Sequence, residues 1–305
     1  MTAHRFLLIS LSNIGDAVMT TPVLQALHAY DPGAVIDIVA DRRSSAIFAG
    51  CPFLGRILHK DKALVMRGLL GLLTELRDVE YDLVVDLRTD ILPLLVRARR
   101  RLFRWQGRPA GPHAVQQHLG VIARLALDIK SFDTKLWLGS AENDFARNVL
   151  AEHLGRRLLA LAPGANWPPK IWPAKQFMEL IELMRGDFDA VVLLGSEADK
   201  IHTSVIAAQS ALPCVDLAGQ TGLLEAAAIL RHTKIFVGND SGLGHIASAV
   251  QIPTLTLFGV GDPDRYHPWG PKASWILEPN RDLSRLLATD VVQVLRKQMG
   301  KFGEK

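Results

Sequence analysis

The sequence contains few cysteines and no long apolar run. Its two cysteines, Cys51 and Cys214, lie far apart in the chain, and their spacing fits neither a metal site nor a disulfide framework. No stretch reaches the roughly 18 apolar residues expected of a transmembrane helix. The apolar run near the N-terminus is too short for a signal peptide, and no small-residue cleavage site follows it. We therefore expect a reduced, intracellular protein whose membrane contact, if any, is peripheral.

The chain also lacks a strong bias in charge. Its 305 residues carry a formal net charge of +4, with 49% apolar and 22% charged residues, which is ordinary for a folded soluble protein. Because this net charge is mild, its distribution matters more than its sum. The length is sufficient for two domains with separate cores.

A third absence concerns the loop after the first apolar run. That run, residues 6–11, leads into SNIGD and not into the GxGxxG pattern that dehydrogenases place after their first strand. The sequence therefore argues against a dinucleotide-dependent dehydrogenase.

Apolar runs of strand length alternate with segments of helical periodicity along nearly the whole chain. In the first half we expect strands at 6–11, 35–40 and 81–87 and helices at 17–30 and 69–76. The pattern restarts at residue 158, with strands expected in LLALA, AVVLLGS, CVDLAG, KIFVG and TLTLFG and helices between them. Such alternation predicts parallel sheets with helices on both faces.

We therefore expect an α/β fold of two doubly wound, Rossmann-like domains that face a cleft. The expected domains are residues 1–155 and 156–305, with the option that the last helix packs back on the first domain. Ligands bind such sheets at the carboxyl ends of the strands, so the loops that follow the strands hold the candidate site residues.

The stretch GNDSGLGH, residues 238–245, follows an expected strand and opens an expected helix. The first N–H groups of a helix have no internal partner and carry a positive dipole, and small residues let a phosphate approach them. Ser241 and His245 could add polar contacts there. Asp240 would repel a phosphate, so we expect it to cap the helix or to accept a hydrogen bond from a hydroxyl. The alternative is a capped helix after a glycine turn, because the pattern is not a standard phosphate-binding motif.

Three further strand ends carry charged residues. Asp16 follows the first strand, Lys170 lies in the proline-walled loop PGANWPPKIWP, and Glu197 follows the strand after that loop. Taken singly, Asp16 could be a helix N-cap, Lys170 a solvated loop charge, and Glu197 a glutamate favoured by the helix dipole. Together they predict a cation and carboxylates around one ligand site.

These stretches resemble, in their order, the family 9 glycosyltransferases, the ADP-heptose:lipopolysaccharide heptosyltransferases of Gram-negative bacteria. The motifs that carry the resemblance are SNIGDAVMTTPVLQALH, PGANWPPKIWP, LLGSEAD, LAGQTGLLEAAAIL and GNDSGLGHIASAVQIPTLTLFG. The resemblance implies a GT-B fold and an inverting, metal-independent transfer. It also implies that the first domain takes the acceptor and the second the nucleotide sugar, on the cytoplasmic face of the inner membrane.

The resemblance also implies roles for individual residues. Asp16 would be the general base that takes the proton of the acceptor hydroxyl, and Lys170 would stabilise the leaving diphosphate. The residues implied to bind the nucleotide sugar are Glu197 at the ribose, Thr221 and Leu223 at the base, and Asp240, Ser241, Gly242 and His245 at the diphosphate. The resemblance implies neither a metal nor another cofactor.

Two other charged stretches have several interpretations. An arginine cluster consists of Arg97, Arg99, Arg100, Arg101 and Arg104. It could be a solvated helix face, a patch for anionic lipid or for acceptor phosphates, or a nucleic-acid site, and a lipid-anchored acceptor favours the second. The DxD in GDPDRYHP, residues 261–268, could bind a metal, but a turn with aspartate caps explains it equally well.

The sequence leaves two alternatives to heptose transfer. One is a GT-B enzyme that uses a UDP- or GDP-sugar, and the other is a nucleotide-sugar epimerase, which also has a two-domain cleft. The proline-walled loop together with NDSGLGH argues against the epimerase.

Overall fold

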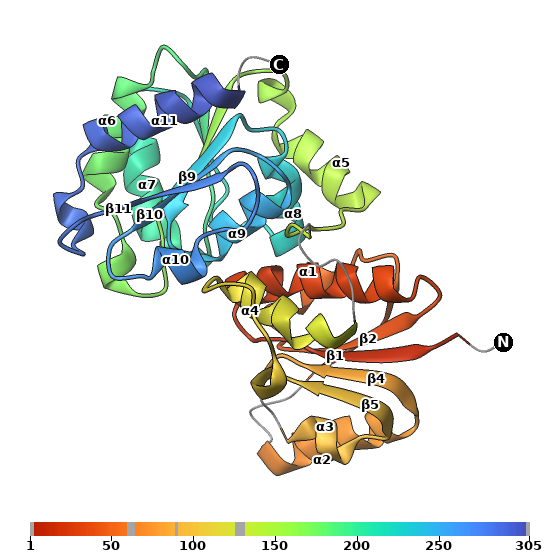
Figure 1. Cartoon of the computed structure of the whole chain (residues 1–305). Coiled ribbons are helices and arrows are strands. Elements are labelled where there is room, and N and C mark those ends of the chain that lie inside the picture. Colours follow the sequence, from red (N-terminus) through yellow and green to blue (C-terminus); the bar gives the residue numbers. More distant parts are fainter. Residues whose placement is uncertain (1–2, 60–64, 89–90, 126–131, 303–305) are drawn as a thin grey trace. The chain divides into compact units, whose positions relative to one another are not determined.

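A computed structural model describes residues 3–59, 65–88, 91–125 and 132–302. The chain forms two compact units, Met1–Trp137 and Leu138–Lys305, and each is built on a parallel sheet (Figure 1). The expected domain boundary fell after residue 155, whereas helix α5 (Ser140–Val149) belongs to the second unit. There α5 packs against α8 (Leu223–Leu230).

The sheet of the first unit has five strands in the order β3-β2-β1-β4-β5 among the residues described. The strands are β1 (Arg5–Ile9), β2 (Val35–Ala40), β3 (Leu54–His59), β4 (Tyr81–Asp86) and β5 (Ala98–Phe103). The helices are α1 (Ile14–Tyr30), α2 (Val65–Arg77), α3 (Leu92–Leu95) and α4 (Ala114–Val121). Helices α2 and α3 cover one face, and α1 and α4 lie together on the other (Figure 1).

Helix α1 continues through Pro22 despite the missing N–H. A proline inside a helix leaves the carbonyl four residues earlier without its donor. Here the hydroxyl of Thr21 donates to that carbonyl, Val18 O, at 2.8 Å. Helix α1, which begins within SNIGD at Ile14, therefore stays intact and holds its first turn at the end of β1.

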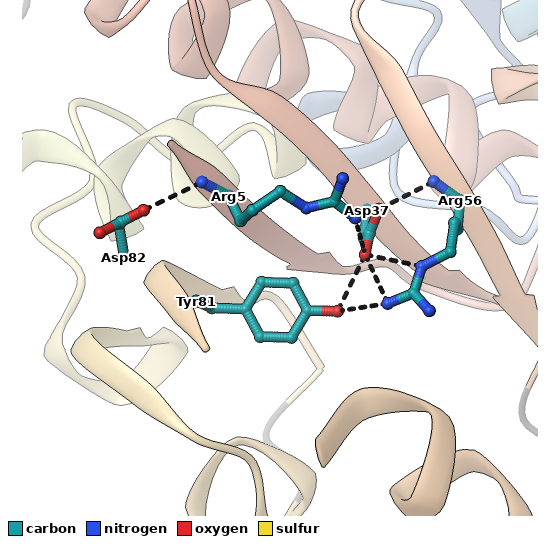
Figure 2. Close-up of polar contacts among 5 residues, drawn as sticks. All are labelled: Arg5, Asp37, Arg56, Tyr81 and Asp82. Carbon is teal, nitrogen blue, oxygen red and sulfur yellow. Dashed lines mark hydrogen bonds and ion pairs between the residues drawn. The ribbon is translucent and has the colours of Figure 1, made fainter. Parts of the chain in front are cut away.

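A buried ionic cluster joins four strands of the first sheet near their amino ends (Figure 2). Asp37 on β2 has no exposed side-chain area and accepts hydrogen bonds from Arg5 at 2.7 Å and from Arg56 at 2.9 Å. The hydroxyl of Tyr81 donates to the same carboxylate at 2.9 Å. Burial alone would raise the pKa of Asp37, but these hydrogen bonds and the charge of Arg5 hold it below its usual value. The cluster lies at the opposite end of the strands from the loops that hold Asp16, so its role is structural.

The sheet of the second unit has six strands in the order β11-β10-β9-β6-β7-β8 in the described ranges. The strands are β6 (Leu158–Ala162), β7 (Ala190–Leu193), β8 (Cys214–Asp216), β9 (Ile235–Asn239), β10 (Thr254–Phe258) and β11 (Ala273–Leu277). Besides α5 and α8, the helices are α6 (Ala174–Leu183), α7 (Lys200–Gln209), α9 (Gly242–Ala249), α10 (Pro263–Tyr266) and α11 (Ala288–Phe302).

The core of the second unit lies between the sheet and helices α6, α7 and α11. It contains Trp172, Phe177 and Leu295, which are fully buried, and α11 packs against α6 within this unit. On the other face, α8 contacts both α5 and α9. Both units are therefore doubly wound α/β sheets, which confirms the expected fold class. Within the described ranges, none of the helices combines the length and apolar character needed to cross a bilayer.

Candidate active site

The strand order of each sheet defines where a ligand is expected to bind. In the second sheet, β6 has β7 on one side and β9 on the other, so the chain reverses direction across the sheet between β6 and β9. In the first sheet the same reversal falls between β1 and β4. Open α/β sheets bind ligands at the carboxyl ends of the strands at such switch points. The Lys170 loop and α9 follow β6 and β9, and Asp16 follows β1.

Lys170 lies directly against the start of α9. The loop after β6 contains a short 3-10 helix, η6 (Pro168–Lys170), and the ammonium of Lys170 donates to Asp240 Oδ2 at 2.5 Å. The two side chains are 25% and 11% exposed. Gly261 also lies against Asp240, because a Cβ there would come within 2.7 Å of Oδ2. Lys170 is therefore not a solvated loop charge.

The expectation that Asp240 caps α9 is wrong. Ser241 is the N-cap residue of α9, with an extended backbone and no hydrogen bond from its side chain to the helix. The carboxylate of Asp240 is neutralised by Lys170, 70 residues away in the chain. A cation and its counterion, not a carboxylate alone, thus border the helix start.

The N-terminus of α9 presents unsatisfied polar groups. The hydroxyl of Ser241 and Nδ1 of His245 are buried, and among the described residues neither atom has a hydrogen-bond partner. Buried polar atoms are nearly always paired in folded proteins. Together with the free N–H groups that begin at Gly242, these atoms form a cradle that suits an anionic, oxygen-rich ligand.

His245 is held in its neutral form. Burial, together with electrostatic repulsion from His267 and Lys170, lowers the pKa of His245 from 6.5 to about 4. At neutral pH its imidazole therefore adds one N–H donor and one acceptor to the site and no charge. The positive charge at the helix start comes from Lys170 and from the helix dipole.

Glu197, Thr221 and Leu223 form a second group at the ends of β7 and β8. Glu197 opens the 3-10 helix η7 (Glu197–Asp199) and pairs with Lys200 at 2.8 Å. A Cβ at Gly219, whose φ is +69°, would come within 2.2 Å of Glu197 Oε2, so the carboxylate lies against the loop that leads to Thr221. Leu223 is the first residue of α8, which Gly222 and Glu225 cap. The structure thus brings these three positions to neighbouring strand ends.

Asp16 lies in the first turn of α1, three residues after the N-cap. The N-cap residue is Asn13, so the interpretation of Asp16 as the cap is wrong. Asn13 Nδ2 donates to Asp16 Oδ2 at 3.0 Å, and the residue is partly exposed. This places a carboxylate, held by its neighbour, at the switch point of the first sheet.

The arginine cluster, Arg97 to Arg104, lies on and beside β5, so the helix-face interpretation is wrong. Nearby carboxylates and backbone carbonyls accept hydrogen bonds from several of these guanidinium groups. Arg99 pairs with Glu80 and Asp82. Arg101 donates to three backbone carbonyls, Pro93, Val96 and Ala98. Arg100 and Arg104 each reach one further carbonyl, Arg124 O and Leu87 O.

The DxD stretch lies in an ordinary helical start. Asp262 is the N-cap of α10 and Asp264 stands in its first turn. Across the described residues, no group of three or more His, Cys, Asp or Glu side chains is placed to hold a metal ion.

Two residues that the sequence analysis passed over hold the strand ends together. Asn239 is buried and bonds to both ends of the Lys170 loop. Asp199 accepts from the N–H and the hydroxyl of Ser196 and lies where a Cβ on Gly164 would stand. The Ser-x-x-Asp spacing of Ser196 and Asp199 is a capping signal that was visible in the sequence. Asn239 carried no comparable signal.

Comparison with known proteins identifies the family. The model of glycosyltransferase family 9 (heptosyltransferase) matches residues 70–293. The chain belongs to glycosyltransferase family 9. Its switch-point sites therefore belong to a glycosyltransferase.

Several characterised heptosyltransferases are similar to the chain over most of their length. Lipopolysaccharide heptosyltransferase 3 of Escherichia coli K12 is 28% identical, covering 84% of this chain and 82% of the relative. Lipopolysaccharide heptosyltransferase 1 of Pseudomonas aeruginosa is 29% identical, covering 85% and 79%. The solved structure of E. coli ADP-heptose LPS heptosyltransferase II is 25% identical and has a TM-score of 0.80, covering 98% and 99%. The GT-B architecture of the chain agrees with the fold expected from its sequence.

Proposed function

We propose that this glycosyltransferase moves a heptose from ADP-heptose to an acceptor of the lipopolysaccharide core, with inversion and without a metal. The names of the relatives, which include an ADP-heptose LPS heptosyltransferase, support the donor and the acceptor class. The observation that carries the proposal is the site at the start of α9. Lys170, the orphaned Ser241 hydroxyl and the orphaned His245 imidazole meet there at the switch point between β6 and β9.

In the proposed donor site, the diphosphate lies at the N-terminus of α9. The N–H groups from Gly242 onward and the hydroxyl of Ser241 hydrogen-bond to its oxygens, and Lys170 neutralises the charge that develops as the sugar leaves. Asp240 and the neutral His245 are the other polar side chains beside the diphosphate. Glu197 binds the ribose hydroxyls, and Thr221 and Leu223 line the base pocket.

In the proposed reaction, the acceptor hydroxyl attacks the anomeric carbon of the heptose. Asp16 takes the proton of that hydroxyl while the bond between the anomeric carbon and the diphosphate oxygen breaks, and ADP leaves with the bonding electrons. Because the attack comes from the face opposite the leaving group, the configuration at the anomeric carbon inverts. The leaving group is stabilised by Lys170 and the helix dipole, so the site supplies the positive charge that a metal would otherwise bring.

We further propose that the first unit, with Asp16, binds the acceptor and that the second unit binds the nucleotide sugar. The exposed arginines Arg97 and Arg100 would contact the phosphates of a lipid-anchored acceptor or the anionic membrane surface, at about 1 kcal/mol per basic residue. The enzyme would then work at the inner face of the inner membrane.

The proposal is tested by calorimetric binding of ADP, UDP, GDP and NAD, followed by transfer assays with ADP-heptose. We expect a clear preference for ADP that a chelator does not reduce, and release of ADP only when a core acceptor is present. A preference for UDP or GDP would indicate that the donor is a UDP- or GDP-sugar and not ADP-heptose. Tight NAD binding would contradict glycosyl transfer altogether.

A further inference from the structure

The loop that carries Lys170 is fixed at both ends by one buried side chain. We define the lysine loop as residues 163–172, the segment between β6 and α6. Asn239, the last residue of β9, is fully buried. Its Nδ2 donates to Pro163 O at 2.8 Å, at the beginning of the loop, and its Oδ1 accepts from Trp172 N at 3.1 Å, at the end of the loop.

The rest of the loop is stiff, so fixing its ends fixes its middle. Pro168 and Pro169 each have a locked φ, and the turn is closed by Lys170 N donating to Trp167 O and Ile171 N donating to Pro168 O, both at 2.9 Å. Trp172 is fully buried, and its indole N–H donates to Leu286 O at 2.9 Å. A displacement of the lysine loop would therefore have to break the bonds to Asn239 first.

Asp240, the residue that follows Asn239, is the partner of Lys170. Asp240 accepts from Lys170 at 2.5 Å, and Ser241 and Gly242 begin α9 immediately afterwards. The peptide that carries Asn239 thus runs directly into the proposed diphosphate cradle. Any shift of the lysine loop relative to β9 would therefore change the distance between Lys170 and the first turn of α9.

We propose that Asn239 is a positioning residue that holds both ends of the lysine loop and so places Lys170 beside the N-terminus of α9. The inference rests on the proposed function, since the catalytic value of the placement comes from the leaving diphosphate. A carboxamide suits this position because it offers a donor and an acceptor in one planar group. An aspartate keeps only the acceptor for Trp172 N, and a leucine of similar size keeps neither.

A second buried carboxamide provides a matched control. Gln298 on α11 is 5% exposed. It donates to Thr254 O at 3.2 Å and to Lys272 O at 2.9 Å, and it accepts from Ser274 at 3.0 Å. These contacts lie near the amino ends of β10 and β11, away from the lysine loop. Asn239 also has three side-chain hydrogen bonds when the longer contact from its Nδ2 to Gly164 O at 3.5 Å is included. Loss of Gln298 therefore removes as many side-chain hydrogen bonds as loss of Asn239 and should leave Lys170 in place.

The first measurement is hydrogen exchange on the full chain without substrate. In Asn239→Leu, the Trp172 amide and the peptide covering the lysine loop should exchange at least about tenfold faster than in wild type, because the lost bond protects that amide. Asn239→Asp should show a smaller increase, and Gln298→Leu none in this segment. Unchanged exchange of the Trp172 amide in Asn239→Leu would overturn the proposal. If that variant does not fold, Asn239→Asp and Asn239→Ser decide the same question.

The second measurement is a double-mutant cycle with Lys170. A misplacement of about 1 Å can lower turnover about 10²-fold, so Asn239→Leu should lower kcat by about that factor while Gln298→Leu stays near wild type. In the Lys170→Met background, Asn239→Leu should change kcat less than threefold, because the group that it positions is gone. If Asn239→Leu lowers kcat by the same factor in the Lys170→Met background as in wild type, the role of Asn239 is structural and does not act through Lys170. If wild type transfers no sugar, the proposed function fails, and hydrogen exchange still decides whether Asn239 clamps the loop.

Discussion

Removal of the Lys170 ammonium should weaken ADP binding in a way that depends on Asp240. The two charged atoms lie 2.5 Å apart, with side chains only 25% and 11% exposed. In Lys170→Met, the diphosphate loses a charge-assisted hydrogen bond worth about 1.5–3 kcal/mol. It also meets a carboxylate that no longer has a counterion.

The size of the second effect follows from Coulomb's law. At an effective dielectric constant of about 20, a unit negative charge of the diphosphate about 8 Å from the Asp240 carboxylate is repelled by roughly 2 kcal/mol. The two effects together cost about 3.5–5 kcal/mol, so we expect Lys170→Met to raise the Kd for ADP about 300- to 4,000-fold, since 1.4 kcal/mol corresponds to about tenfold. The double variant Lys170→Met/Asp240→Asn should recover about 30-fold of this loss, because its amide no longer repels the diphosphate.

Isothermal calorimetry with two ligands tests this prediction. Adenosine, which lacks phosphates, should bind wild type and Lys170→Met equally well. Lys234→Met, which removes an exposed lysine at the amino end of β9, should leave both affinities unchanged. Equal affinity of wild type and Lys170→Met for ADP, or a parallel loss for adenosine, would refute the placement of the diphosphate at Lys170.

Three further predictions concern single residues. Asp16→Asn should keep the Kd for ADP within about twofold and lower transfer by about 10²–10⁴-fold, the usual range for a general base; near-normal turnover would remove that role. For His245, the unfolded chain binds more protons than the fold between its ordinary pKa of 6.5 and its folded pKa of about 4. This group's contribution to the free energy of unfolding therefore falls as pH drops, by roughly 2 kcal/mol from pH 7.5 to 5. Urea titrations should show that His245→Gln lacks this part of the pH dependence, and identical slopes would contradict the buried neutral imidazole. Asp37→Ala should lower the free energy of unfolding by about 3–5 kcal/mol, because Arg5 and Arg56 lose their buried counterion. The exposed pair of Arg147 and Asp144 serves as control, since Asp144→Ala should cost under about 1 kcal/mol.

The central strands could be predicted from the sequence, but most edge strands could not. Strands β1, β4, β6 and β9 are almost entirely buried, and each contains an apolar run in the sequence. The three strands that were not expected are β3, β5 and β11, which all lie at sheet edges. Their sequences LGRILH, ARRRLF and ASWIL mix polar and apolar residues, because an edge strand buries less of each side chain. The edge strand β8 was expected from the stretch CVDLAG.

The sequence predicted which residues lie at the strand ends better than it predicted their partners. Alternating strands and helices indicate which residues follow strands, and so Lys170 and Asp240 were both expected near a ligand. Their pairing depends on β6 lying beside β9, and the order of strands in a sheet is set by packing of the whole unit. For the same reason Asn239, whose partners are Pro163 and Trp172, looked like any residue at the end of a strand.

The repeated architecture fits the two opposite chemistries of the proposed transfer. Glycosyl transfer needs a base at the acceptor and positive charge at the leaving group. Each unit of this enzyme offers one switch point, beside the first strand of its sheet. After β1 that position holds the carboxylate of Asp16, and after β6 it leads into the loop of Lys170. Lys170 already pairs with Asp240 in the structure, and a second carboxylate in the same pocket would compete for the ammonium. In the proposed reaction, placing Asp16 at the end of a separate sheet keeps this carboxylate available for the proton of the acceptor hydroxyl.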